Sequence, residues 1–235
     1  MLKQFVISAF SDCHGYIPSE IPESDILCIA GDISPLSIQR NSAKMVEWIE
    51  CNFIPQINNL PCKKVFLVAG NHDFVFEDDK YFNKIMELFK ERCPKLTYLE
   101  NEFSTYEDLV IFGSPDVIGP EGWAFWDEKL LRIKSNYKKI PLVDIAIFHQ
   151  PLWHHENGTV LQYGYSRANY GSLILDNIVN ERKPLLVFTG HVHSGNHNIV
   201  KVNDRTSVVN VSIKNESYVV EYPVFTTTIE KELFE

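Results

Sequence analysis

Short apolar runs recur along the chain, each rich in β-branched or aromatic residues and each bounded by polar or turn residues. This pattern is typical of strands, and near-continuous hydrophobicity indicates strands that are covered on both faces. The last two runs alternate in part, which predicts antiparallel strands or strands exposed on one face. The predicted strands are Phe5–Phe10, Ile26–Ala30, Val65–Ala69, Leu109–Phe112, Val143–Phe148, Leu185–Phe188, Ser207–Ile213 and Val224–Ile229.

Helical periodicity appears between several of these runs. The clearest case has apolar residues at i, i+3, i+4 and i+7 counted from Phe82. The predicted helices run from near Asp79 to before Pro94, from about Ser37 to Asn52, and from about Gly171 to Arg182. Strands that alternate with helices, followed mainly by strands, predict an α/β layered fold with a mixed sheet or a pair of sheets. No repeat or linker interrupts residues 1–235, so we expect a single domain, with the irregular residues 113–140 as a capping loop.

The composition narrows the function. A content of 45% hydrophobic and 23% charged residues is ordinary for a globular protein. The formal net charge of −9 argues against a stable nucleic-acid complex, although metal ions would supply local positive charge for a small phosphorylated substrate. Five cysteines without a CxxC pair favour a reducing compartment. The first apolar run is too short to span a membrane, so we expect a cytoplasmic protein with no membrane association.

Residues of metal-ligand type gather at the ends of five apolar runs. Ligands in α/β sheets bind outside the carboxyl ends of the strands, so parallel neighbours would bring these groups to one edge. Each group alone is weak evidence, because a buried histidine more often binds a backbone carbonyl than a metal. The series of five carries the prediction. The groups are Asp12-Cys13-His14-Gly15, Gly31-Asp32, Gly70-Asn71-His72-Asp73, His149-Gln150-Pro151 and Gly190-His191-Val192-His193.

The chemistry of these groups suits divalent transition metals. Carboxylate, imidazole and amide ligands together accept Mn, Fe, Zn, Ni or Co, and no thiolate is required. Residues two apart on an extended segment project to the same side, which pairs Asp12 with His14 and His191 with His193. A glycine precedes three of the candidate ligands and lets the backbone approach a ligand closely. Cys13 should project to the opposite face and serve packing alone.

In series, the motifs D-x-H, G-D, G-N-H-D, H-x-P and G-H-x-H resemble the calcineurin-like metallophosphoesterase superfamily, over nearly the whole chain from Asp12 to His193. Stretches such as LVAGNHDFVFED and VFTGHVHSG are similar to the small metallophosphoesterase-domain (239-like) phosphodiesterases. The resemblance implies a four-layer α-β-β-α sandwich of two mixed sheets flanked by helices. It also implies two divalent transition-metal ions as cofactors, with Mn as the expected metal and Fe, Zn, Ni or Co as alternatives.

The same resemblance implies a role for each candidate ligand. It assigns Asp12, His14 and His193 to the first ion, Asn71, His149 and His191 to the second, and Asp32 to the bridge between them. A bridging carboxylate is physically reasonable, because two ions about 3.5–4 Å apart need an anion to offset their repulsion. The expected reaction is in-line attack on phosphorus by a bridging hydroxide, formed from water whose pKa the ions lower to about 7 or below.

His72 follows Asn71 directly and is not needed as a metal ligand. In the resembling family this histidine helps to protonate the departing alkoxide while the next carboxylate orients it, which here implies His72 and Asp73. A carboxylate partner raises the pKa of an imidazole and fixes its tautomer, as a general acid near neutral pH requires. The simpler alternative is that His72 only contacts the substrate phosphate.

Three further residues are candidate substrate contacts. Trp123 belongs to an aromatic cluster with Phe125 and Trp126, on which a nucleobase could stack, although core or lid packing explains the cluster equally well. His154 lies in a loop shortly after Pro151, and Arg167 is the arginine that could reach the site. No arginine lies within or next to the five ligand groups in the sequence, which favours diesters, because monoesters usually need additional cationic groups.

The predicted function is hydrolysis of a phosphodiester, with cyclic nucleotides among the candidate small substrates. A phosphomonoesterase with the same mechanism is the nearest alternative. A non-catalytic protein-binding scaffold on this fold should have lost some ligands, and none is missing from the sequence. A nuclease for polynucleotides would need an extended basic groove, which the net acidity opposes. The sequence carries no signal for the oligomeric state.

Overall fold

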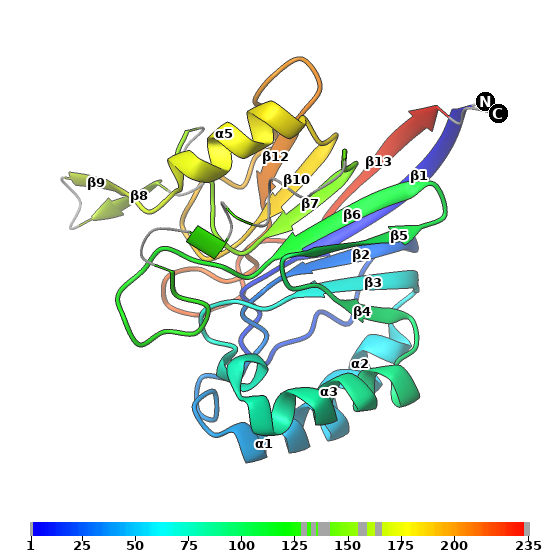
Figure 1. Cartoon of the computed structure of the whole chain (residues 1–235), viewed down its shortest axis with the longest axis vertical. Helices are drawn as coiled ribbons and strands as arrows, with labels where there is room; N and C mark the ends of the chain where they lie inside the picture. Colours follow the sequence, from blue (N-terminus) through cyan, green and yellow to red (C-terminus); the bar gives the residue numbers. More distant parts are fainter. Residues whose placement is uncertain are drawn as a thin grey trace.

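The computed structural model describes residues 2–127, 131–132, 135, 142–154, 159–162 and 166–232. Two mixed sheets lie face to face, and helices cover the outer face of each sheet (Figure 1). This arrangement confirms the four-layer α-β-β-α sandwich that the resemblance implied. The single-domain organisation of residues 1–235 stays a prediction.

The first sheet has the strand order β13-β1-β2-β3-β4. The first four strands of the chain run parallel to one another, and β13 pairs antiparallel with β1 at the edge. β13 is half exposed, as the alternating pattern predicted. The strands are β1 Leu2–Phe10, β2 Ser24–Ala30, β3 Cys62–Val68, β4 Leu96–Tyr98 and β13 Phe225–Glu232.

The second sheet has the strand order β11-β12-β10-β7-β6-β5. Its four inner strands are parallel, and the two edge strands are antiparallel to their neighbours. The strands are β5 Glu102–Tyr106, β6 Leu109–Ser114, β7 Ile145–Phe148, β10 Leu186–Thr189, β11 Val200–Lys201 and β12 Ser207–Asn210. A separate two-stranded ribbon consists of β8 Thr159–Gln162 and β9 Ser166–Asn169.

Helices before β3 and before β4 cover the first sheet, and in the described part of the chain α5 covers the second (Figure 1). The predicted helix from about Ser37 begins later, because residues 36–40 form a turn and Asn41 caps the first helix through the Lys44 amide. The other two helices are close to their predicted limits. The helices are α1 Ser42–Trp48, η1 Ile49–Phe53, α2 Ile54–Asn59, η2 Phe74–Glu77, α3 Asp79–Arg92 and α5 Leu173–Arg182.

Several elements differ from the sequence prediction. The short strands β4 and β11 carry too few residues for a recognisable period, and β5 is mostly exposed, so it lacks an apolar run. The run Ser207–Ile213 was expected to be antiparallel or half exposed. Its strand, β12, is antiparallel to the edge strand β11, as expected, but parallel to β10. It is largely buried rather than half exposed, because Val209 faces the core between the two sheets and Val208 faces the apolar layer under α5.

Three layers of apolar side chains hold the sandwich together. In β2, Leu27 and Ile29 face the helices, whereas Ile26 and Cys28 face the second sheet. Leu175 of α5 packs on the outer face of the second sheet. Each large apolar side chain buried in this way contributes about 1.5–3 kcal/mol to stability. Since both faces of the inner strands are buried, their ends are held rigidly at the junction of the two sheets.

Gly113 of β6 lies at a close approach between the sheets, and we predict that Gly113→Ala destabilises the fold by about 1–3 kcal/mol through overpacking. An added Cβ would lie 2.7 Å from Val68 Cγ2 and 2.6 Å from Leu99 Cβ. Urea denaturation measures the change. Gly119→Ala is the matched control, because a Cβ there meets nothing within 4 Å. Equal midpoints for the two variants would show that the sheets can separate at no cost.

Candidate metal centre

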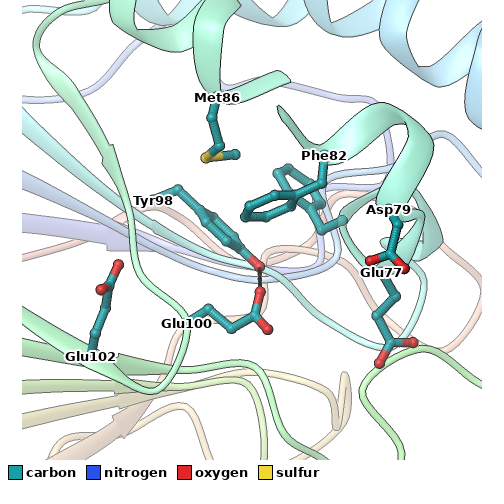
Figure 2. Close-up of a pocket in the computed structure, with 8 residues that line it drawn as sticks. Glu77, Asp79, Phe82, Met86, Tyr98, Glu100 and Glu102 are labelled. Atoms are coloured by element: carbon teal, nitrogen blue, oxygen red, sulfur yellow. Dashed lines mark hydrogen bonds between the residues drawn. The ribbon is translucent and has the colours of Figure 1, made fainter. Parts of the chain in front are cut away.

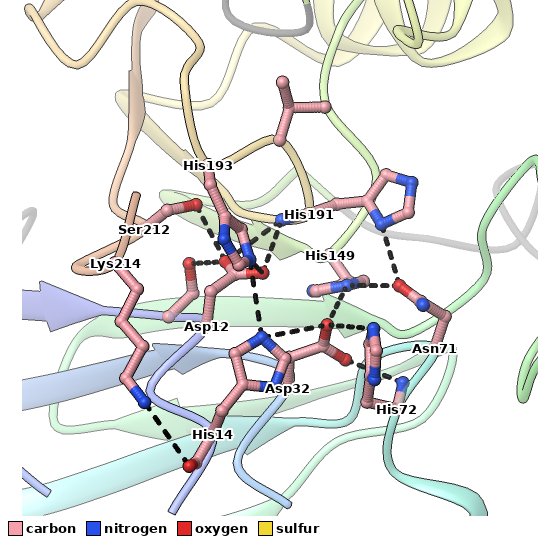
Figure 3. Close-up of polar contacts among 12 residues, drawn as sticks. Asp12, His14, Asp32, Asn71, His72, His149, His191, His193, Ser212 and Lys214 are labelled. Carbon is pink, nitrogen blue, oxygen red and sulfur yellow. Dashed lines mark hydrogen bonds and ion pairs between the residues drawn. The ribbon is translucent and has the colours of Figure 1, made fainter. Parts of the chain in front are cut away.

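The five predicted ligand groups meet where the two sheets stack, at the carboxyl ends of their parallel strands. Three groups follow β1, β2 and β3 of the first sheet, and two follow β7 and β10 of the second. The sequence predicted convergence on one edge. The structure brings the groups together from two sheets, so the centre depends on sheet packing as well as on strand order (Figure 3).

Several of these residues have a left-handed backbone, which is rare outside glycine. The φ angles are +53° at Asp12, +41° at His14, +55° at Asp32 and +70° at His191. Each such residue costs free energy that the surrounding structure must offset, and such residues cluster at functional sites. The left-handed turns direct the side chains away from the strands and toward one another.

The glycines before Asp32 and Asn71 are needed for space, as the sequence predicted. A Cβ at Gly31 would lie 2.4 Å from the Nδ1 atom of His149. A Cβ at Gly70 would lie 2.3 Å from the Oδ1 atom of Asp32. Any side chain at either position would displace a candidate ligand.

Asp12, His14 and His193 form the first cluster, and all three are buried. The Nε2 atom of His193 lies 3.3 Å from Asp12 Oδ1 and 3.4 Å from the Nε2 atom of His14. One carboxylate oxygen and two imidazole nitrogens thus point into a common volume. This donor set suits a divalent transition metal.

Asn71, His149 and His191 form the second cluster. The Oδ1 atom of Asn71 lies 3.0 Å from the Nε2 atom of His149 and 2.7 Å from the Nδ1 atom of His191 (Figure 3). The Oδ2 atom of Asp32 lies between the two clusters. It is 3.4 Å from the Nε2 atom of His149 and 3.9 Å from that of His14.

The electrostatics of the centre also suit a cation. Burial opposes the charged form of Asp32, but the neighbouring imidazoles of His149, His72 and His14 together outweigh burial and hold the pKa of the carboxyl well below its usual range. Burial likewise disfavours protonated His149 and His193, yet the facing carboxylates raise the pKa of each imidazole to about 9. The two buried carboxylates, Asp12 and Asp32, therefore draw positive charge into the centre, and divalent ions supply such charge.

Hydrogen bonds behind the candidate ligands fix which atoms face the centre. The Nδ1–H groups of His149 and His193 donate to the carbonyls of Ala30 and Asn215, at 2.8 and 2.9 Å. Their Nε2 atoms are therefore available as ligands, an arrangement typical of metal-binding histidines. For Asp12, Ser11 Oγ and Ser212 Oγ donate to its Oδ2 atom at 2.5 and 2.8 Å. The residues present thus fit a metal centre.

His197 lies behind His193, and its Nε2 atom contacts the His193 carbonyl.

His72 adjoins the centre, with its Nε2 atom 3.8 Å from Asp32 Oδ2. Its Nδ1 atom lies 2.5 Å from Oε1 of Gln39. The predicted partner, Asp73, is engaged elsewhere: it accepts hydrogen bonds from the amides of Gly70 and Ser34 and from the Ser34 hydroxyl. Burial, together with the charge of Asp32, raises the pKa of Asp73 to about 6. Asp73 therefore stabilises the loop that carries Asn71, and Gln39 orients His72.

Of the predicted substrate contacts, Trp123 lies against the centre, with its ring 4.6 Å from that of His72. The rest of its aromatic cluster serves packing: Phe125 is buried, and the Trp126 indole N–H donates to the Gly119 carbonyl. His154 is exposed and pairs with Asp176 at 2.6 Å. The side chain of Arg167 lies outside the described part of the chain.

Arg40 and Tyr218 also flank the centre and were not predicted. The Arg40 guanidinium lies over the Trp123 ring, 5.2 Å from its centroid. Tyr218 contacts His14 and His193 edge-on, at 5.0 and 5.2 Å, from a left-handed backbone position. No arginine is next to the ligand groups in the sequence, but the fold supplies one nearby, because the turn before α1 brings Arg40 to Trp123.

Cys13 is buried, as predicted for a packing residue.

A pocket elsewhere in the molecule, of about 640 Å³, is chemically unsuited to phosphate. It lies between α3 and the β4–β5 segment, with Phe82, Met86 and Tyr98 along one side (Figure 2). Carboxylates complete the lining, and Tyr98 donates a hydrogen bond to Glu100 at 2.9 Å. The carboxylates are Glu77, Asp79, Glu100 and Glu102. Such a wall repels an anion, so the metal centre is the candidate for phosphate chemistry.

No helix in the described part of the chain is long and apolar enough to cross a membrane.

We predict that Mn(II) or Zn(II) raises the thermal midpoint of chelator-treated protein, because an ion that binds only the folded state stabilises it by about 2.7 kcal/mol at 100 times its Kd. Asp32→Asn should remove most of this metal-dependent shift. Asp116→Asn is the matched control, since Asp116 is a buried carboxylate that pairs with Arg132 and not with the centre. Calorimetry with elemental analysis measures both. An unchanged shift in Asp32→Asn would contradict the assignment.

Comparison with known proteins identifies relatives of the chain. A family model described as calcineurin-like phosphoesterase matches residues 6–195. Metallophosphoesterase domain-containing protein 1 of Homo sapiens is 27% identical over 228 residues, covering 88% of this chain and 66% of that protein. UPF0046 protein K07C11.7 of Caenorhabditis elegans is 25% identical over 220 residues, covering 89% and 70%. The chain thus spans about two thirds of the length of these relatives.

Solved structures share the fold. One of them has a TM-score of 0.63 at 18% identity and covers 88% of this chain and 90% of its own. TT1561 of Thermus thermophilus has a TM-score of 0.52 at 14% identity, with coverage of 88% and 89%. Because the family model matches well over half of the chain, the protein belongs to the calcineurin-like phosphoesterase family, a family of metal-dependent phosphate-ester hydrolases.

Proposed function

We propose that the protein hydrolyses a phosphodiester at a dinuclear metal centre. The observation that carries the proposal is the position of Asp32 Oδ2, which lies within 4 Å of imidazole nitrogens from both ligand clusters. When bound, the two ions supply positive charge for the phosphate oxygens and lower the pKa of water so that it attacks phosphorus. Manganese is our proposed metal, and a single domain our proposed organisation for residues 1–235.

The proposed ligands divide as the two clusters do. The first ion is assigned to Asp12, His14 and His193, the second to Asn71, His149 and His191, and the bridge to Asp32. The serine hydroxyls on Asp12 and the carbonyls behind His149 and His193 hold these side chains in place. Rigid ligands keep the reacting atoms aligned, which is a large part of catalysis of phosphoryl transfer.

His72 is proposed as the general acid. The attacking water gives one proton to solvent. As its oxygen bonds to phosphorus, the P–O bond to the alcohol breaks, and the alcohol oxygen takes a proton from Nε2 of His72, which regains a proton from solvent. The contact to Gln39 supports this role, because an amide oxygen that accepts from Nδ1–H leaves Nε2 as the atom that exchanges protons. The same acceptor serves the imidazole before and after the transfer, so Gln39 need not move.

A phosphomonoesterase is the second candidate function. Arg40 favours it, since a guanidinium over Trp123, whose ring contacts His72, is the kind of cationic group that a monoester dianion needs. The contact between Trp123 and His72 supports a place for a flat ester group, such as a nucleobase, next to the proposed general acid.

The cytoplasmic location of the protein stays a prediction.

We expect the manganese-loaded protein to release p-nitrophenol from bis(p-nitrophenyl) phosphate faster, by kcat/KM, than from p-nitrophenyl phosphate. Asp32→Asn should abolish turnover of both esters, and Asp116→Asn should retain it. A preference for the monoester would establish the second candidate function instead. If elemental analysis shows two metal ions bound per chain and neither ester is hydrolysed, both candidate functions are refuted.

We predict that His72→Asn lowers kcat about 10²- to 10⁴-fold for diesters with alkyl leaving groups, as expected when a general acid is removed. The loss should be much smaller for p-nitrophenyl esters, because nitrophenolate leaves without a proton. Gln39→Leu should show the same dependence on the leaving group, to a smaller degree. Steady-state kinetics on a series of leaving groups measures the effect. Equal losses across the series would contradict the acid role and leave the phosphate-contact interpretation of His72.

A further inference from the structure

Arg40 lies near the metal centre, where two aromatic rings and a backbone carbonyl contact its guanidinium. Its guanidinium carbon lies 4.1 Å from the centroid of the Phe74 ring and 5.2 Å from that of Trp123. The two rings are 5.9 Å apart, at an interplanar angle of 34°. In addition, Nη2 donates a hydrogen bond to the Gly122 carbonyl at 3.3 Å. Two aromatic contacts and a backbone acceptor thus restrict a side chain that otherwise has high rotamer freedom.

Arg40 carries a charge that no described carboxylate neutralises. Among the residues that the structure describes, no carboxylate lies within ion-pair distance of its guanidinium, although the chain carries a net charge of −9. A guanidinium has five N–H donors in a planar fork, and one Arg40 contact, to Gly122, is to backbone. The remaining donors suit the geometry of a carboxylate or a phosphate.

Arg40 lies near the side of the centre from which the alcohol would leave. Trp123 connects the guanidinium with His72, whose ring lies 4.6 Å from the indole. His72 is the proposed donor of the proton to the departing alcohol, so Arg40 lies on the leaving-group side. Tyr218 contacts His14 and His193, and the Lys214 ammonium donates to the His14 carbonyl, so the cation beside Trp123 is Arg40.

We propose that Arg40, supported by Phe74 and Trp123, forms a subsite for an anionic group on the alcohol that leaves. This inference rests on the proposed function, because it takes the leaving-group side from His72. It names the substrate class as a phosphate ester whose alcohol carries a carboxylate or a second phosphate. The pocket lined by Glu77 and Glu100 offers no comparable position, since its carboxylates repel such a group.

The test compares two diesters that differ by one charge: methyl 4-nitrophenyl phosphate and its analogue with a carboxylate on the nitrophenyl ring. Manganese-loaded protein should prefer the carboxylated diester by about tenfold in kcat/KM, since a hydrogen-bonded ion pair with a guanidinium is among the stronger polar contacts. Arg40→Met, which keeps most of the alkyl chain, should remove the preference. Lys84→Met is the matched control for net charge, because Lys84 is an exposed residue of α3; this variant should keep the preference.

Two outcomes would overturn the subsite. One is a wild-type protein that does not prefer the carboxylated diester. The other is an equal loss on both diesters in Arg40→Met, which would mean that Arg40 contacts the reacting phosphate or only supports Trp123. Calorimetric binding of the same two compounds gives the selectivity without turnover. Selective binding with no hydrolysis would refute the proposed function while supporting the subsite.

Discussion

Two buried carboxylates, Asp12 and Asp32, lie side by side with imidazoles at the junction of two sheets, and much of the structure serves to keep them there. Burial alone would drive such groups to their neutral forms. Facing histidines reverse that tendency: His149 stabilises the charge of Asp32, and His193 that of Asp12. The centre is therefore charged and polar in the middle of an apolar sandwich, which is the condition that metal ions relieve.

The polar centre is stable because the surrounding fold is rigid. Parallel strands buried on both faces end at the junction, and left-handed turns after them redirect the side chains. Glycines at 31 and 70 admit the His149 and Asp32 side chains, which any Cβ would displace. Serine hydroxyls and backbone carbonyls then fix the orientation of each carboxylate and imidazole. Local strain at the site is thus offset by packing elsewhere.

The rim of the centre differs from its interior in both origin and chemistry. The interior consists of groups from strand ends, whereas the rim consists of side chains from loops: Arg40 before α1, Trp123 after β6 and Tyr218 before β13. Loops tolerate changes in sequence better than strand ends do. The candidate ligands therefore belong to the framework, whereas the aromatic and cationic side chains around them belong to loops.

The sequence by itself determined the strands that carry long apolar runs, three helices and the five groups of candidate ligands, because apolar runs and the polar residues that end them are local patterns. Tertiary structure decided the rest. Gln39 meets His72 from 33 residues away, and Arg40 meets Gly122 from 82 residues away. Neither contact leaves a period in the sequence. The family resemblance implied that Asp73 orients His72, yet the turn directs the Asp73 carboxylate to Ser34. Spacing along the chain predicts which residues reach the same sheet edge, but only packing decides which side chains touch.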